Sequence, residues 1–131
     1  MSDSEPEDIE EIRERKREEL LAAASSHDEP VHVDGRDDLE ELVAEGGVVV
    51  ADFYADWCGP CKMLEPVLES VATGTAATVA KVDVDANQDL ASEFGVQGVP
   101  TVVVFADGQQ VETLVGVRDE ETLVGLVDRY A

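Results

Sequence analysis

Cysteine is scarce in this chain of 131 residues: it occurs only twice, and both copies fall within four consecutive residues. A framework of structural disulfides, as in small secreted domains, needs several distant pairs and is therefore excluded. Two cysteines this close together indicate redox or metal chemistry in a reducing compartment. Long apolar runs and the apolar core of a signal peptide are missing as well, so we expect a cytoplasmic protein without a membrane-spanning helix.

Phosphate-binding glycine motifs are also lacking, and basic residues are few. The sequence contains neither a G-x-G-x-x-G fingerprint nor a P-loop, so we expect no bound flavin or nucleotide. Nine Lys and Arg stand against 31 Asp and Glu, which gives a formal net charge of −22. A charge of this sign repels nucleic acid and anionic membranes, and neither is expected as a partner.

The excess of acidic residues runs along the whole chain. Residues 1–30 carry 11 acidic and 4 basic residues, and residues 31–131 carry 20 and 5. One explanation is an acidic surface shaped for a basic partner. The other is adaptation to a salty cytoplasm, because salt near 1 M reduces the Debye length to about 3 Å and screens the repulsion. The even spread and the scarcity of lysine, present only as Lys16, Lys62 and Lys81, favour a halophilic microorganism.

Composition changes near residue 30, where a Ser-rich stretch and Pro30 suggest a linker. Before it, Ser4 and Glu7 resemble a capping box, and acidic residues precede basic ones, which favours a helix over 5–24. Its apolar stripe is thin. Residues 1–30 are therefore predicted to be an acidic extension, partly helical or disordered, that is either solvated or docked on the domain or a partner.

Residues 31–131 show the pattern of an α/β domain. Strands are predicted over 31–33, 48–55, 79–84, 101–106 and 110–115, and helices over 37–45, 61–73, 87–94 and 119–130. The near-continuous apolar run over 48–55 is typical of a central strand that is covered on both faces. The segments 48–55, 61–73 and 79–84 form a βαβ unit, and Asp107-Gly108 marks a hairpin that adds antiparallel strands.

The two cysteines lie where the central strand ends and a helix begins, in the segment Trp57-Cys58-Gly59-Pro60-Cys61-Lys62. Cys58 falls at the helix N-cap, where free N–H groups and the helix dipole stabilise a thiolate. Cys61 follows one turn later, close enough to close a disulfide. We therefore expect Cys58 to be the exposed attacking thiolate and Cys61 the shielded resolving thiol, with Gly59 leaving access open and Pro60 stiffening the first turn.

This segment, WCGPCK, resembles the active site of the thioredoxin family, and the similarity extends over residues 31–131. The resemblance implies a thioredoxin fold, with a mixed sheet of about five strands flanked by helices. It also implies a monomeric enzyme that reduces the disulfides of client proteins through a reversible Cys58–Cys61 disulfide and without another cofactor. Its electrons are expected from a thioredoxin reductase, a flavoprotein.

A carboxylate interrupts the central strand at Asp52, between Ala51 and Phe53. A carboxyl group in such a run is expected to be desolvated, with its pKa raised towards neutrality. By resemblance, Asp52 matches the family's buried aspartate, which transfers protons to and from the resolving cysteine. Lys81 matches the lysine that pairs with it.

The resemblance also implies a surface for clients. Gly98-Val99-Pro100-Thr101 matches the family's cis-proline turn, which packs against the two sulfurs and exposes the backbone of Val99 for pairing with an extended client segment. Gly116 matches the glycine beside this groove. We call the apolar surface predicted here the docking face; it comprises Trp57, Gly59, Pro60, Val99 and Gly116, bordered by Pro100 and Thr101.

Three alternatives remain open at this stage. Cys58 and Cys61 have the spacing of a zinc knuckle, and His27 and His32 could add ligands. A redox-inactive interaction module is a second possibility, although such proteins usually lose a cysteine. The third is an oxidase or isomerase, but the Gly-Pro pair between the cysteines resembles reducing members.

Two residues depart from the family pattern without touching the thiols. They are Tyr54, where many members have Trp, and Asp56, where some have Glu.

Overall fold

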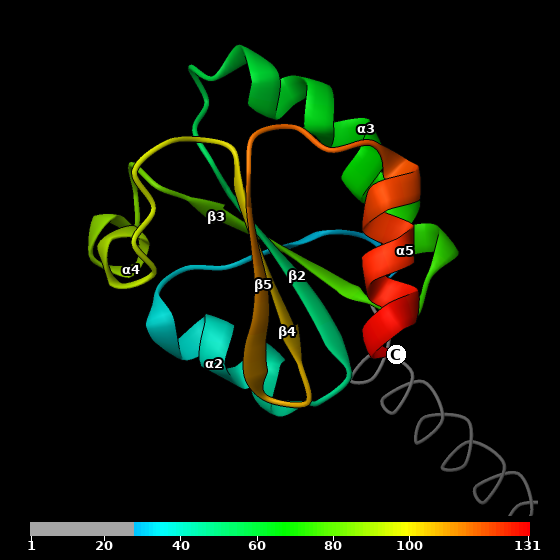
Figure 1. Cartoon of the computed structure of the whole chain (residues 1–131). Coiled ribbons are helices and arrows are strands. Elements are labelled where there is room, and N and C mark those ends of the chain that lie inside the picture. Colours follow the sequence, from blue (N-terminus) through cyan, green and yellow to red (C-terminus); the bar gives the residue numbers. More distant parts are fainter. Residues whose placement is uncertain (1–27) are drawn as a thin grey trace, which may run out of the picture.

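Helices and strands alternate along residues 28–131, the residues that the computed structural model describes. In chain order they are β1 (Val31–His32), α2 (Arg36–Ala44), β2 (Val48–Tyr54), α3 (Gly59–Gly74), β3 (Thr78–Asp83), α4 (Gln88–Glu93), β4 (Thr101–Ala106), β5 (Gln109–Val115) and α5 (Glu120–Tyr130) (Figure 1). This is the predicted order of elements. The helix predicted over 5–24 lies outside the described residues.

The five strands form one mixed sheet in the order β1-β3-β2-β4-β5. Strands β1, β3 and β2 are parallel, whereas β4 runs antiparallel to β2, and β5 antiparallel to β4. Strands β2 and β3 are the two parallel strands of the predicted βαβ unit, with α3 between them. The register pairs Asp52 of β2 with Lys81 of β3, so an acidic residue of one central strand lies beside a basic residue of the other.

Helices cover both faces of the sheet, with α2 and α4 on one side and α3 and α5 on the other (Figure 1). Side chains of β2 alternate between the two resulting cores, because successive residues of a strand point to opposite faces. Val49, Ala51 and Phe53 join the core under α2 and α4, and Val48 and Val50 join the core under α3 and α5. By this alternation Asp52 lies on the face that α3 covers.

All element boundaries fall within two residues of their predicted positions, and the main differences have local causes. Helix α3 begins at Gly59 instead of residue 61, because Cys58 is the N-cap and the proline falls in the first turn, where it costs no hydrogen bond. Strand β2 ends at Tyr54, since the chain then turns so that the Cys58 N–H donates to the Ala55 carbonyl. The hairpin between β4 and β5 has positive φ at Asp107 (50°) and Gly108 (89°), as the Asp-Gly pair predicts.

Candidate active site

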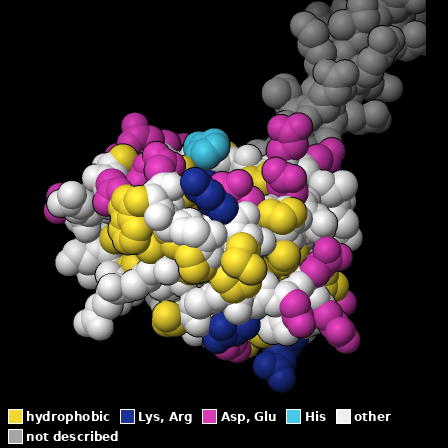
Figure 2. Space-filling model, turned by 90° about the horizontal axis from the view of Figure 1, so that it is seen from above, with side chains coloured by type: hydrophobic (Ala, Val, Ile, Leu, Met, Phe, Trp, Pro, Cys, Tyr) yellow, Lys and Arg dark blue, Asp and Glu magenta, His cyan; other side chains and the backbone are white. Residues whose placement is uncertain are grey.

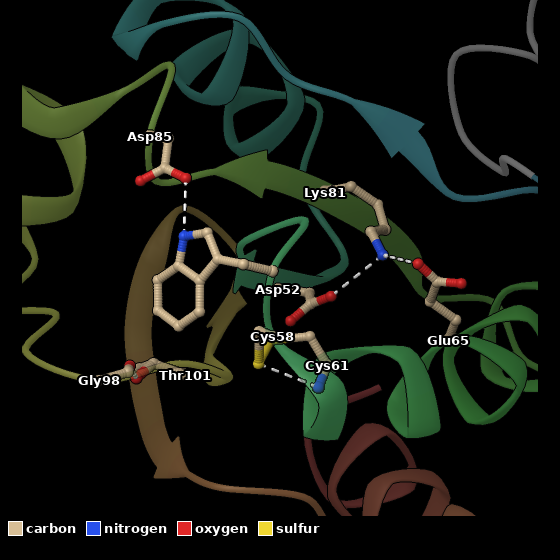
Figure 3. Close-up of a disulfide and its surroundings, with 9 residues drawn as sticks. Asp52, Cys58, Cys61, Glu65, Lys81, Asp85, Gly98 and Thr101 are labelled. Carbon is tan, nitrogen blue, oxygen red and sulfur yellow. Dashed lines mark hydrogen bonds and ion pairs between the residues drawn. A yellow bond between two sulfur atoms is a disulfide. The ribbon is translucent and has the colours of Figure 1, made fainter.

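A disulfide joins Cys58 and Cys61 at the start of α3. Their Cα atoms are 5.3 Å apart, within the usual range for bridged cysteines. Cys58 has extended backbone and caps the helix, and its Sγ accepts a hydrogen bond from the Cys61 N–H at 3.1 Å (Figure 3). The sulfur of Cys58 therefore lies where the free N–H groups of the helix end would stabilise negative charge.

Burial does not separate the two cysteines, so the expectation of an exposed Cys58 is wrong for the disulfide form. Cys58 is 3% exposed and Cys61 is 2% exposed. Both pack in a small cluster with Ala55, and the half-buried side chains of Tyr54, Val84 and Val99 lie against it. The N-cap position of Cys58, and not its exposure, is what distinguishes it from Cys61 in this structure.

Asp52 is fully buried, at 0% exposure. Its Oδ2 lies 3.4 Å from the Nζ of Lys81, and neither carboxylate oxygen has a hydrogen-bond partner among the described residues. Burial raises the pKa of Asp52 to about 6, and the Lys81 ammonium offsets part of this rise. The carboxyl group can therefore gain and lose a proton close to neutral pH, as the sequence predicts.

Lys81 lies between two carboxylates and over an aromatic ring. Its Nζ is 3.7 Å from Oε1 of Glu65 on α3 (Figure 3). The same Nζ is 4.3 Å from the centre of the Tyr54 ring. The Lys81 side chain is 8% exposed, whereas that of Glu65 is 52% exposed. Sequence reasoning missed Glu65, although its position four residues after Cys61 places it on the same helix face as the resolving cysteine.

Trp57 stands out from the surface with 72% exposure, next to the disulfide in the chain. Its indole Nε1 donates a hydrogen bond to Oδ2 of Asp85 at 2.9 Å, which ties the ring to the connection between β3 and α4. Sequence reasoning missed Asp85 as well. No local signal could have found it, because the two residues are 28 positions apart.

The turn before β4 lies against the cysteines. The Val99–Pro100 peptide bond is cis, Pro100 is buried, and Val99 is half-buried against the cysteine cluster. The Thr101 hydroxyl donates to the Gly98 carbonyl at 2.6 Å and so closes the turn. Thr101 is itself only 3% exposed, which leaves its hydroxyl directed into the turn instead of towards a client.

Gly116 follows β5 with φ of 93°, a conformation that favours glycine. Its N–H donates to the Pro100 carbonyl at 2.8 Å, so the end of β5 is fastened to the proline turn. The fold thus brings together, at one end of the sheet, the cysteine segment, the proline turn and Gly116, which are far apart in the sequence.

The surface around the disulfide is apolar. Gly59 and Pro60 are exposed in the first turn of α3, as expected for the docking face. Hydrophobic side chains gather in the middle of the face seen in Figure 2, bordered by acidic side chains and by a few Lys and Arg side chains above and below. The large exposed hydrophobic residues of the described chain include three that sequence reasoning missed: Met63, Val115 and Val117.

Lys81 also lines a groove of about 660 Å³, which we call the acidic groove. It contains five carboxylate residues: Asp28, Glu29, Asp56, Glu65 and Glu69. His32 of β1 and Tyr54 of β2 also line it. The described residues contain no group of three or more His, Cys, Asp or Glu side chains arranged to hold a metal ion, and no helix among them is long and apolar enough to cross a membrane.

Comparison with known proteins agrees with this geometry. The thioredoxin family model matches residues 30–129. A thioredoxin from Chlamydia muridarum is 43% identical over 101 residues, covering 76% of this chain and 98% of that protein, and one from Bacillus subtilis is 49% identical over 86 residues, covering 64% and 83%. A solved mutant thioredoxin from Halobacterium salinarum has 58% identity and a TM-score of 0.78, covering 80% of this chain and 93% of that one.

Proposed function

This chain belongs to the thioredoxin family and is a thiol–disulfide oxidoreductase, and on that premise we propose the roles of its site residues in reducing protein disulfides. In the dithiol form, the Cys58 thiolate attacks one sulfur of a client disulfide. A bond forms between Cys58 and that sulfur, and the other client sulfur leaves with the electron pair and takes up a proton. The N-cap position of Cys58 is the observation that supports this role, because it favours a thiolate.

Cys61 completes the reaction as the resolving cysteine. Its thiol gives a proton to the Asp52 carboxylate, and the resulting thiolate attacks the sulfur of Cys58. The Cys58–Cys61 bond forms, the bond from Cys58 to the client breaks, and the client leaves with its second sulfur reduced. Two electrons have passed from this chain to the client. A pKa of about 6 suits Asp52 to this exchange, and Lys81 is its charge partner.

Clients bind over the docking face. The exposed Trp57, Gly59 and Pro60 supply apolar contact beside Cys58. The backbone N–H and C=O of Val99 form no hydrogen bond with other described residues, so they are available to pair with an extended client segment. Gly116 and Pro100 shape the edge of this surface, and Thr101 acts indirectly, by closing the turn that presents Val99.

The partners and setting of the enzyme follow from its composition and family. The chain has no flavin or nucleotide fingerprint, so a separate thioredoxin reductase, a flavoprotein, is proposed to recharge the disulfide. We assign the catalytic unit to residues 31–131 and treat residues 1–30 as an acidic extension, in line with a family match that starts at residue 30. A monomer acting in a salt-rich cytoplasm agrees with the net charge of −22.

Reduction of insulin by dithiothreitol tests the reaction. We expect the full chain to accelerate insulin precipitation, and a Cys58→Ser variant to lose the acceleration, because the attacking sulfur is gone. A Cys61→Ser variant retains Cys58; reduced first and then mixed with insulin in the absence of dithiothreitol, it should accumulate a mixed disulfide that is visible on a non-reducing gel. Acceleration by the Cys58→Ser variant would contradict the assignment.

The direction of electron flow is tested by the redox potential of the Cys58–Cys61 pair. We expect a reducing value near that of other thioredoxins, about −270 mV, measured by equilibration with a glutathione or dithiothreitol buffer. A value near −120 mV, typical of strong disulfide oxidants, would assign the protein to oxidation instead.

A further inference from the structure

The ion pair between Lys81 and Glu65 has no role in the reaction described so far. Lys81 is held between Asp52, at 3.4 Å, and Glu65, at 3.7 Å, so its ammonium serves two carboxylates at almost equal distances (Figure 3). The two carboxylates differ in their access to solvent: Asp52 is completely buried and the Glu65 side chain is half exposed. The contact therefore connects the buried acid to the surface of the acidic groove.

Helix α3 couples this contact to the thiols. Glu65 comes four residues after Cys61, and residues four apart lie one above the other on a helix face. Lys81 comes from β3, directly beside Asp52 in the register of β2 and β3. Glu65 thus shares a helix face with Cys61 and an ion pair with Lys81, and Lys81 in turn pairs with Asp52.

We propose that Glu65 is a positioning residue of the reaction: it holds the Lys81 ammonium between two carboxylates and so sets how readily Asp52 exchanges the proton of Cys61. This inference rests on the proposed function, because it assigns a regulator to the same proton step. Without Glu65, the ammonium is free to settle on Asp52 alone, and the ionised form of Asp52 gains stability. With Glu65 present, Lys81 is shared, and Asp52 keeps its affinity for the proton.

The other charged and titratable groups at this place act less directly. The ring of Tyr54 on β2 lies under the Lys81 ammonium. Burial raises the pKa of the Tyr54 phenol, so the phenol remains neutral at the pH of the reaction. The remaining charged or titratable groups that line the acidic groove with Lys81 are Asp28, Glu29, His32, Asp56 and Glu69. Cys58 and Cys61 are joined in the disulfide and do not titrate in the oxidised chain. Among the described residues, Asp52 and Glu65 are the carboxylates that form ion pairs with Lys81. The negative charge of Glu65 also raises the pKa of Asp52 directly.

The test compares two substitutions that remove the same charge from the same helix. Glu65→Gln removes the contact with Lys81. Glu69→Gln is the matched control, because Glu69 lines the same groove one turn later and forms no ion pair with Lys81 within the described residues. The Asp52 carboxyl is titrated by carbon-13 NMR in the full, oxidised chain, at low salt so that screening does not hide the difference.

We expect the titration midpoint of Asp52 to move to lower pH in Glu65→Gln, and to move less in Glu69→Gln. The acidic limb of the pH profile for insulin reduction should move in the same direction in Glu65→Gln, which a purely structural role would not produce. Equal shifts in the two variants, or no shift in Glu65→Gln, would overturn the proposal. A shift of the midpoint with an unchanged pH profile would overturn it as well, since Glu65 would then act on Asp52 without acting on the reaction.

Two separate measurements distinguish failure of the proposed reductase function from failure of the proposed role of Glu65. The NMR titration uses the oxidised protein without a client, so its result does not depend on catalysis. Insulin reduction by the unmodified chain is measured separately. Loss of that activity with an intact Glu65 effect would reject the reductase and keep the charge contact.

Discussion

Asp52 pairs full burial with a titratable carboxyl group, and this combination makes folding depend on pH. Its pKa is about 6 in the folded chain, against 3.8 for an aspartate in water. Between these values the folded state keeps a proton that the unfolded chain has lost, so stability falls as the pH rises through this window. Well below pH 3.8 the residue is neutral in both states and carries no penalty.

We therefore expect Asp52→Asn to stabilise the fold at pH 7.5, by up to about 3 kcal/mol, because roughly two pKa units correspond to this difference in free energy. The gain should vanish near pH 3.5. The measurement is urea unfolding of both proteins at the two pH values and at one fixed KCl concentration. A gain of equal size at both pH values would show that packing, and not ionisation, is responsible.

The contacts that sequence reasoning missed at the residue scale share one physical origin. Glu65 and Asp85 act on partners that the fold brings close from another element, Lys81 and Trp57. The N-cap position of Cys58 and the burial of Asp52 could be predicted because local features determine them: a helix start for Cys58 and an apolar strand for Asp52. The buried state of Cys58 could not, because it depends on Tyr54, Val84 and Val99 from three separate segments.

At the scale of elements, the end of β5 is the segment that fixes the proline turn. Gly116 holds φ of 93° while its N–H bonds to the Pro100 carbonyl. An added Cβ would meet Nη1 of Arg118 at 3.6 Å, which is ordinary contact, so the cost of a substitution comes from the backbone. This makes Gly116 a test of backbone conformation without crowding.

Gly116→Ala is expected to lower the free energy of unfolding by about 1–2 kcal/mol, since a side chain disfavours positive φ. The matched control is Gly125→Ala, inside α5, where an added Cβ meets nothing within 4 Å. Alanine is the better helix former, so this control should stabilise by roughly 0.5–1 kcal/mol. Chemical unfolding measures both. Changes of the same sign in the two variants would contradict the conformational argument.

The order of the elements could be predicted with few errors because apolar periodicity and turn residues determine it locally. The run over 48–55 indicated the central strand, and Asp107-Gly108 indicated the hairpin. Helix α3 begins at Gly59, as its N-cap at Cys58 requires, two residues before the helix range predicted over 61–73. Strand order and register, by contrast, depend on which faces of α2, α3, α4 and α5 pack on the sheet, and the periodicity of a single chain segment does not specify this.

Charge dominates the behaviour of the whole molecule. A net charge of −22 on 131 residues opposes compaction, and salt weakens this repulsion as the Debye length falls from about 10 Å at 0.1 M. We expect the melting temperature to rise as KCl is increased from about 0.1 M to about 2 M, with most of the rise below about 1 M, where screening changes most. Calorimetry in KCl, with sucrose as an uncharged control, measures the effect. A melting temperature that is insensitive to KCl would speak against adaptation to salt.

The exposed indole next to the disulfide has a practical consequence. Trp57 is the one tryptophan in the chain, and it is 72% exposed next to Cys58 in the sequence. Excitation at wavelengths that tyrosine does not absorb makes this single ring the source of the emission. A protein that covers it changes the polarity around the ring and hence the colour of the emitted light. The molecule therefore carries its own optical reporter on the surface proposed for client binding, and a change in its emission on addition of a client would follow binding without a dye.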